Sequence, residues 1–152
     1  SNMDTIKTKI KTRDFGEIEI SEKDMILFSS GLFAFDDLRN FVIISPLGEG
    51  IYPMWLQSAE DEKPCFIVYN PFEIIKDYSP RLSESDKKSV DFSDGDELFY
   101  LVIAVVPSDV KKTTVNLKSP IVINRTKLTA SQIILDESYD IKFPIFREKG
   151  VD

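Results

Sequence analysis

Histidine is absent from this sequence of 152 residues, and cysteine and tryptophan each occur only once. Without histidine the chain cannot build Ser-His-Asp or Cys-His nucleophilic catalysis, a two-histidine, one-carboxylate iron site or nearly any zinc site. The single Cys65 cannot form an internal disulfide or a thiolate metal cage, which agrees with a reducing compartment. Because Cys65 opens an apolar run, it is predicted to be a buried and unreactive thiol.

Long apolar runs are also missing. No stretch approaches the ~18 apolar residues of a membrane span, and no signal-peptide core follows Met3. Ser1 and Asn2 are interpreted as a cloning remnant before the start methionine, and the chain is expected to be cytoplasmic. Glycine-rich phosphate-binding motifs are absent as well. We therefore predict no cofactor, no metal ligands and no catalytic residues.

The charge balance is acidic, with a formal net charge of −7. An acidic surface disfavours direct binding to nucleic acid or to anionic membrane, because both repel it. It suits either simple solubility or a basic protein partner, and composition does not decide between the two.

Hydrophobic residues alternate with polar ones along most of the chain, which is typical of strands with one buried face. The clearest unit is a hairpin in which an acidic turn, residues 59–64, joins strands at Met54–Ser58 and Cys65–Tyr69. Glu97–Val106 is apolar on both faces and indicates a central strand. About ten short strands and little helix predict one all-β domain over residues 4–150, a barrel or a sandwich.

The remaining elements are predicted from shorter patterns. A helix is expected within Ser79–Ser89, because Ser83 is a good cap residue. Asp94-Gly95-Asp96 is typical of a hairpin turn. Further extended segments or turns are predicted at Ile6–Thr12, Glu17–Ile20, Ser21–Asp24, Met25–Phe28, Asp36–Arg39, Phe41–Ser45, Phe72–Ile75, Lys111–Leu117, Ile121–Ile123, Gln132–Leu135 and Ile141–Phe146.

Carboxylates are the only catalytic groups that the composition leaves. They cluster at two predicted turns, Glu60-Asp61-Glu62 and Asp94 with Asp96 and Glu97. A glycosidase needs two carboxylates across a cleft, one of them with a raised pKa in an apolar pocket, and neither cluster has such a setting. Solvated turn charges are the preferred interpretation, and a carboxylate hydrolase is the minor alternative. Trp55 is interpreted as a core residue, with a sugar-stacking platform in a carbohydrate-binding module as the alternative.

Several motifs spread over the chain resemble those of one family. W-L-Q-S-A-E-D at 55–61 and F-I-V-Y-N-P-F at 66–72 look like the flagellar assembly factor FliW family. The same order and spacing hold for the other matching segments, F-G-E-I-E-I at 15–20, F-x-x-G-L at 28–32, D-Y at 77–78, T-T-V-N-L-K-S-P-I-V-I-N at 113–124 and S-Q-I-I-L-D-E-S-Y at 131–139. The chain departs from the family where Ser29, Phe33 and Ala34 replace its usual proline and glycine residues.

The resemblance implies a non-enzymatic adaptor. Members of this family bind flagellin in the cytoplasm and also bind CsrA, a small basic dimer that represses translation of flagellin mRNA. Export of flagellin frees the adaptor, which then takes CsrA off the message. An acidic protein docked on a basic RNA-binding protein adds negative charge beside the path of the phosphate backbone, which lowers RNA affinity.

The candidate partner-binding surface lies in the loops around the central hairpin, where exposed acids and an apolar residue occur together. The alternative is that Phe72 belongs to the core and the acids only keep the protein soluble. The residues of this candidate surface are Glu60, Asp61, Glu62, Asn70, Pro71 and Phe72.

Overall fold

The structure is a computed structural model that describes residues 6–30, 32 and 37–146. The expectations for residues 1–3, and for Phe33, Ala34 and Asp36, lie outside these residues. The described part of the chain is mostly β, with two short α-helices. The elements are β1 Lys7–Lys11, β2 Glu17–Ser21, β3 Ile26–Phe28, β4 Asn40–Ile44, β5 Met54–Ser58, β6 Cys65–Tyr69, α1 Pro71–Ile74, α2 Glu84–Ser89, β7 Leu98–Val105, β8 Thr114–Val115, β9 Ile121–Asn124, β10 Thr129–Gln132 and β11 Phe143–Pro144.

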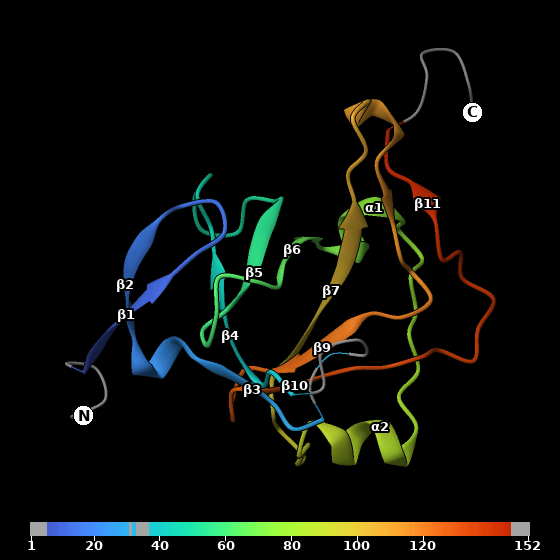
Figure 1. The fold of residues 1–152 in the computed structure, drawn as a ribbon. Coiled ribbons are helices and arrows are strands. Elements are labelled where there is room, and N and C mark those ends of the chain that lie inside the picture. The colour runs from blue at the N-terminus through green and yellow to red at the C-terminus, as the bar shows by residue number, and fades with distance from the viewer. Residues whose placement is uncertain (1–5, 31, 33–36, 147–152) are drawn as a thin grey trace.

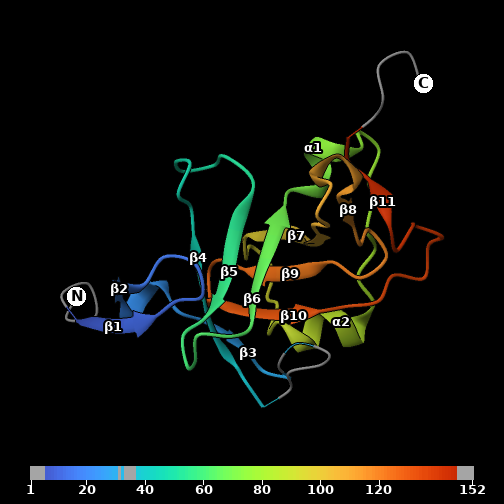
Figure 2. The same ribbon diagram turned by 45° about the horizontal axis from the view of Figure 1, so that its top comes forward.

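Seven of the strands close into a barrel (Figures 1 and 2). Their order is β7-β6-β5-β4-β3-β10-β9, and β9 pairs with β7 to complete the ring. Neighbouring strands are antiparallel except β3 and β10, which run parallel. The prediction of an all-β fold is confirmed, and of the two architectures it allowed, the barrel is the one that forms.

Strand β7 is the element that joins the barrel to the rest of the molecule. On one side Val102 and Ile103 pair with β6. On the other side residues 98–101 pair with β9, and residues 104–105 pair with β8. Strand β8 in turn pairs with β11, so a short second ribbon extends from the end of β7 (Figure 1).

Alternate residues of β7 enter two separate hydrophobic cores. Leu101 lies inside the barrel, in a cluster to which every barrel strand contributes a buried side chain. Val102 lies in a second cluster outside the barrel wall, under the segments that contain α1, α2 and β11. Both side chains have no exposed surface. The prediction that this strand is covered on both faces is confirmed.

The β1–β2 hairpin lies beside the barrel and is held to it through its turn. Gly16 takes a φ of +66°, which a side chain would strain, and Thr12 closes the turn by donating to the Gly16 carbonyl. Arg13 then reaches the central hairpin, where its guanidinium donates to the Cys65 carbonyl over 2.7 Å and its backbone N–H to the Gln57 side chain over 3.1 Å. These bonds dock the predicted N-terminal hairpin on β5 and β6.

Four predicted elements are wrong in part. The Phe72–Ile75 segment begins in helix α1 rather than in an extended path, because Asn70 accepts the Phe72 N–H and Pro71 occupies the first helical position. The predicted strand Lys111–Leu117 starts with a 3-10 turn, Val110–Lys112, and only Thr114–Val115 pair as a strand.

The other two differences concern the region around α2. The helix covers only Glu84–Ser89, where Ser83 and Asp86 form a reciprocal capping box, and the stretch that contains Pro80 stays outside it. The Asp94-Gly95-Asp96 turn forms, and Gly95 is the one of its three residues with a positive φ, +89°. The turn does not join two strands of a hairpin, because the element before it is helix α2. In the described ranges, no helix is both long and apolar enough to cross a membrane.

The barrel core is the test of this architecture. We expect Leu101→Ala to lower the free energy of unfolding by about 2–5 kcal/mol, because it leaves a cavity among side chains from all seven strands. Val105→Ala, at a residue that is 62% exposed near the end of the same strand, should change it by less than about 0.5 kcal/mol. Urea unfolding measures both. Equal effects of the two substitutions would contradict a core centred on Leu101.

Candidate functional site

The acidic turn between β5 and β6 is braced from beneath by two buried side chains. Gln57 is fully buried and donates to the carbonyls of Ser58, Asp61 and Glu62 at 3.2, 3.3 and 2.9 Å. The Ser58 hydroxyl accepts the backbone N–H groups of Glu60 and Asp61. The turn backbone is therefore held by the barrel wall, and the side chains of Asp61 and Glu62 extend from it into solvent.

Glu60 differs from its two neighbours. Its carboxylate accepts the backbone N–H groups of Asn40 and Arg39, at 2.8 and 2.7 Å. These two bonds, the one from Asn40 first, hold the pKa of Glu60 below its ordinary value. The carboxylate joins the turn to the start of β4, so Glu60 is exposed, as predicted for all three acids, but it is also tied to the backbone of residues 39–40.

The second half of the candidate surface surrounds α1. Pro71 is buried, so it cannot contribute contact area to a partner. The side-chain oxygen of Asn70 accepts the Phe72 N–H and caps the helix. Phe72 is 44% exposed, and the rest of its ring packs edge-on against Tyr78 and Tyr100, with ring centroids 5.5 and 5.7 Å away. Phe72 is thus an exposed aromatic side chain held in place by an aromatic cluster.

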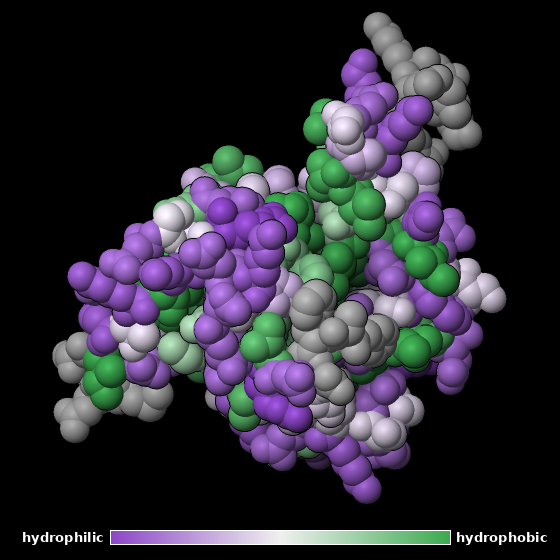
Figure 3. All heavy atoms as spheres, in the orientation of Figure 1, coloured by the Kyte–Doolittle hydropathy of each residue, from purple (hydrophilic) through white to green (hydrophobic). Residues whose placement is uncertain are grey.

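The structure separates the two halves of this surface. Asp61 and Glu62 lie at one end of β6 and Phe72 at the other (Figure 1). The five residues of β6 span about 17 Å at ~3.3 Å each. Figure 3 shows hydrophobic surface gathered in the hollow over β6 and β7 near α1, whereas the side that carries β1 and β2 is mostly hydrophilic. The surface beside the start of β6 is therefore acidic, and the surface beside its end is apolar.

Trp55 is half-buried and does not belong to either core, so its interpretation as a core residue is wrong. Its indole N–H donates to Asp14 over 3.0 Å, and the Phe15 ring meets its ring edge-on at 5.4 Å. Hydrogen bonds from Arg13, and then from Trp55, hold the pKa of Asp14 below its ordinary value. Because these contacts fasten the β1–β2 turn to β5, they favour a structural role for Trp55 over sugar stacking.

The second acidic cluster is not uniformly solvated as predicted. The Asp96 side chain is only 8% exposed and accepts hydrogen bonds from Ser93, Asn124 and Lys127. The bond from Asn124 is the main cause that lowers the pKa of Asp96. A hydrolase acid needs a raised pKa, so the shifts at Glu60 and Asp96 run opposite to that requirement.

Metal and thiol chemistry find no support in the described part of the chain. No group of three or more His, Cys, Asp or Glu side chains there is arranged to hold a metal ion. Cys65 is 6% exposed, and burial raises the pKa of its thiol to about 11, so the thiol stays protonated at neutral pH. The predicted buried and unreactive cysteine is confirmed.

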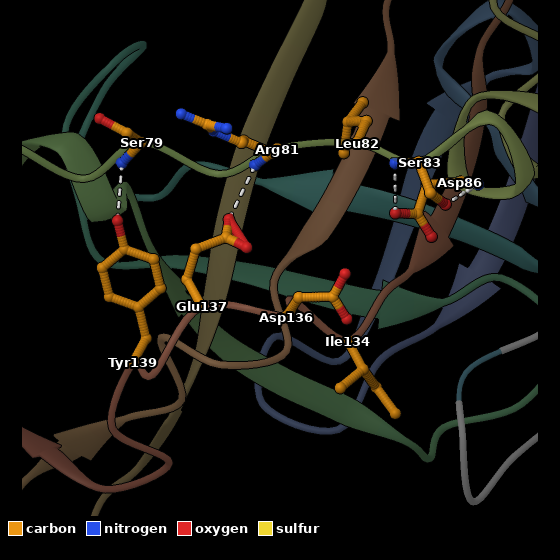
Figure 4. Close-up of a pocket in the computed structure, with 9 residues that line it drawn as sticks. All are labelled: Ser79, Arg81, Leu82, Ser83, Asp86, Ile134, Asp136, Glu137 and Tyr139. Carbon is orange, nitrogen blue, oxygen red and sulfur yellow. Dashed lines mark hydrogen bonds between the residues drawn. The ribbon is translucent and has the colours of Figure 1, made fainter.

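A groove that sequence patterns did not indicate lies between the stretch before α2 and the stretch after β10 (Figure 4). It encloses about 760 Å³. Its walls come from segments some fifty residues apart in the chain, which is why no local motif reveals it. The lining residues are Ser79, Arg81, Leu82, Ser83, Asp86, Ile134, Asp136, Glu137 and Tyr139.

The fold defines a small protein built around a seven-stranded β-barrel. The sequence profile of the FliW protein family matches residues 9–145. The chain belongs to the FliW family.

Individual relatives agree with this assignment. The flagellar assembly factor FliW of Caldicellulosiruptor bescii is 39% identical over 147 residues, which cover 96% of this chain and 95% of the relative. The FliW protein of Clostridium tetani is 38% identical, covering 93% and 98% of the two chains. The crystal structure of a flagellar assembly factor FliW superposes with a TM-score of 0.85 at 31% identity, covering 93% of this chain and 99% of that one.

The role of Glu60 can be tested by pH. A folded-state pKa below the ordinary 4.5 means that Glu60 stabilises the fold above about pH 4.5, and that this stability is lost as the pH falls through the folded-state value. We expect Glu60→Gln to destabilise the protein at pH 7 by less than about 1 kcal/mol, since the carboxylate is exposed, and to have almost no effect near pH 3. Urea unfolding at both values measures the difference. An effect that is independent of pH would contradict this role.

Proposed function

We propose that this chain is a cytoplasmic, non-enzymatic adaptor that binds flagellin and the translational regulator CsrA, and that it relieves repression of flagellin mRNA by exchanging one partner for the other. Membership of the FliW family, whose named relatives are flagellar assembly factors, is the observation that carries this proposal. The surface chemistry supports it. A net charge of −7 with a rigid acidic turn suits a basic partner, and it is unsuited to direct contact with nucleic acid.

The two ends of β6 suit different partners. Asp61 and Glu62 are both exposed, and among the described residues the one hydrogen bond of their side chains joins the Glu62 N–H to the Asp61 carboxylate within the turn. They are proposed to meet the basic CsrA dimer. Phe72, held by Tyr78 and Tyr100, is proposed as an anchor for flagellin, because rigid exposed aromatic side chains dominate the energetics of many interfaces. Asn70 and Pro71 support Phe72 by starting the helix that carries it.

This separation is compatible with partner exchange. A standard interface buries about 800 Å² on each partner, which corresponds to a patch about 30 Å across. Each such patch reaches about 15 Å from its centre, so patches at the two ends of β6, a strand about 17 Å long, would meet along it. The two partners would therefore exclude one another even though their anchoring residues differ.

The acidic end is tested by charge reversal. We expect Asp61→Lys combined with Glu62→Lys to weaken CsrA binding about tenfold at low salt and by less at high salt, since the attraction is screened. Isothermal titration calorimetry with purified CsrA measures the change. Glu49→Lys, at another exposed acid in the loop before β5, is the matched control and should bind CsrA almost as the unmodified chain does. Unchanged affinity in the folded double variant would contradict this landing site.

The apolar end needs a separate experiment. We expect Phe72→Ala to weaken flagellin binding about tenfold, because it removes the exposed ring while the Tyr78 hydrogen bond to Leu117 remains. Leu27→Ala is the control, since Leu27 is also 44% exposed but lies on β3. Binding is measured by titration with monomeric flagellin, and both variants are checked for unchanged urea midpoints. Equal weakening by both substitutions would contradict a specific role for Phe72.

A further inference from the structure

The groove of Figure 4 borders a sheet edge that continues past the end of β10. Beyond Gln132 the chain stays extended, because Ile133 donates to the Pro120 carbonyl and Leu135 to the Lys118 carbonyl, at 3.0 and 2.9 Å. Burial alternates along it as in a strand. Ile133 and Leu135 enter the outer core, whereas Ile134 and Asp136 face solvent.

The other edge of this extension has no partner strand. The backbone groups of Ile134 and Asp136 make no hydrogen bond to any residue in the described part of the chain. In an extended chain, backbone groups of alternate residues point to opposite sides. Since the N–H groups of Ile133 and Leu135 point towards residues 118–120, the backbone groups of Ile134 and Asp136 point to the side away from those residues, and both residues line the groove.

The facing wall is held away from this edge by side chains rather than by backbone pairing. Ser79 donates its backbone N–H to the Tyr139 hydroxyl, and Arg81 donates its own to the Glu137 carboxylate (Figure 4). Both bridges lie at the Glu137–Tyr139 end of the groove. Ile134 and Asp136 make no hydrogen bond to the facing wall among the described residues, and the groove volume of about 760 Å³ is within the range of ligand-binding clefts.

Charge and polarity indicate what this open end would accept. Three carboxylates line the groove, those of Asp86, Asp136 and Glu137, against the single guanidinium of Arg81. In Figure 4 the carboxylate of Asp136 lies along the groove between Glu137 and Ile134, and it has no hydrogen bond or ion pair with a described residue. Next to it, Ile134 leaves 62% of its surface exposed.

We propose that this groove binds an extended segment of a partner protein, which adds as a strand to the edge at Ile134–Asp136 and carries a lysine or arginine two positions away from an apolar residue. Backbone hydrogen bonds to Ile134 and Asp136 supply the affinity, as in other cases of strand addition. The basic side chain pairs with Asp136, and the apolar one covers Ile134. This site is distinct from the acidic turn and from Phe72, so it stands independently of the assignment of those two surfaces.

An exposed strand edge also invites aggregation, and natural proteins often place a charge there to prevent it. Asp136 serves as such a guard against neutral or acidic strands. The same carboxylate attracts a strand that carries a basic side chain. Asp136 therefore disfavours neutral or acidic strands and favours basic ones.

Amide hydrogen exchange followed by NMR tests strand addition directly. In the free protein the amides of Ile133 and Leu135 should exchange slowly and those of Ile134 and Asp136 rapidly. A short capped peptide in which every second residue is in turn lysine and valine, with threonine between them, presents both side chains on one face and should, at saturation, slow exchange at Ile134 and Asp136 at least about tenfold. Binding without protection of these two amides would overturn the proposal.

Matched probes separate strand addition from simple charge attraction. The same peptide with glutamate in place of lysine should not bind. The lysine peptide should not bind either when the backbone nitrogens that would face the Ile134–Asp136 edge are methylated. Asp136→Lys should weaken binding of the lysine peptide at least about threefold, whereas Glu49→Lys should not. Unchanged protection at Ile133 and Leu135 verifies that the Asp136→Lys variant is folded. Equal binding of the methylated peptide, or of the Asp136→Lys variant, would overturn the proposal.

The experiment also separates this site from the proposed function. The Asp136→Lys variant should keep CsrA binding at the acidic turn. If CsrA binding is lost along with peptide binding, the groove is part of the CsrA surface and not an independent site, and the proposal as stated is overturned. If the peptide result holds while the Asp61 and Glu62 variants bind CsrA normally, the groove stands and only the assignment of the acidic turn fails.

Discussion

Strand β7 is the constraint on which the rest of the structure depends. Its outward and inward side chains are buried in two different cores, and its edges pair with β6, β9 and β8. Burying apolar side chains on both faces excludes water from the strand and fixes its register, because a shift of one residue would exchange Leu101 with Val102 between cores of different shape. This one strand therefore connects three parts of the molecule. They are the barrel, the ribbon of β8 and β11, and the cover formed around α1 and α2.

The candidate surfaces are rigid because each rests on this framework. The acidic turn is braced by Gln57, which is itself buried in the barrel wall. Phe72 rests on Tyr100 of β7 and on Tyr78 of the outer core. Such preorganisation reduces the conformational entropy lost on binding, which is the main way in which a small exposed feature gains affinity. The candidate surfaces of this chain are thus loops and edges that rest on a packed barrel.

Local patterns in the sequence were sufficient for the elements whose residues alternate cleanly. The hairpin of β5 and β6 was predicted with its observed bounds, because two alternating runs flank a polar turn. The segment after this hairpin differs from its predicted structure. The apolar residues from Phe72 to Ile75 suggested extension, although Asn70 followed by Pro71 is a helix-start signal and forms one here.

Other features depend on contacts between distant segments, which a single sequence does not reveal. The capture of Glu60 by the backbone of residues 39–40 joins two turns about twenty positions apart. The hydrophobicity of Trp55 alone predicts a core position. The structure instead holds Trp55 near the surface through contacts with Asp14 and Phe15 of another hairpin, which the local sequence does not reveal. The groove likewise requires the stretch before α2 to lie opposite the stretch after β10, and nothing in either stretch names the other.

The central claim is that this chain is an adaptor between flagellin and CsrA. The most direct measurement is a pull-down with this chain as bait from a lysate of flagellated cells, with the bound proteins identified by mass spectrometry. The account predicts recovery of both flagellin and CsrA, with added monomeric flagellin reducing the CsrA that is recovered. Recovery of neither protein would contradict the functional assignment.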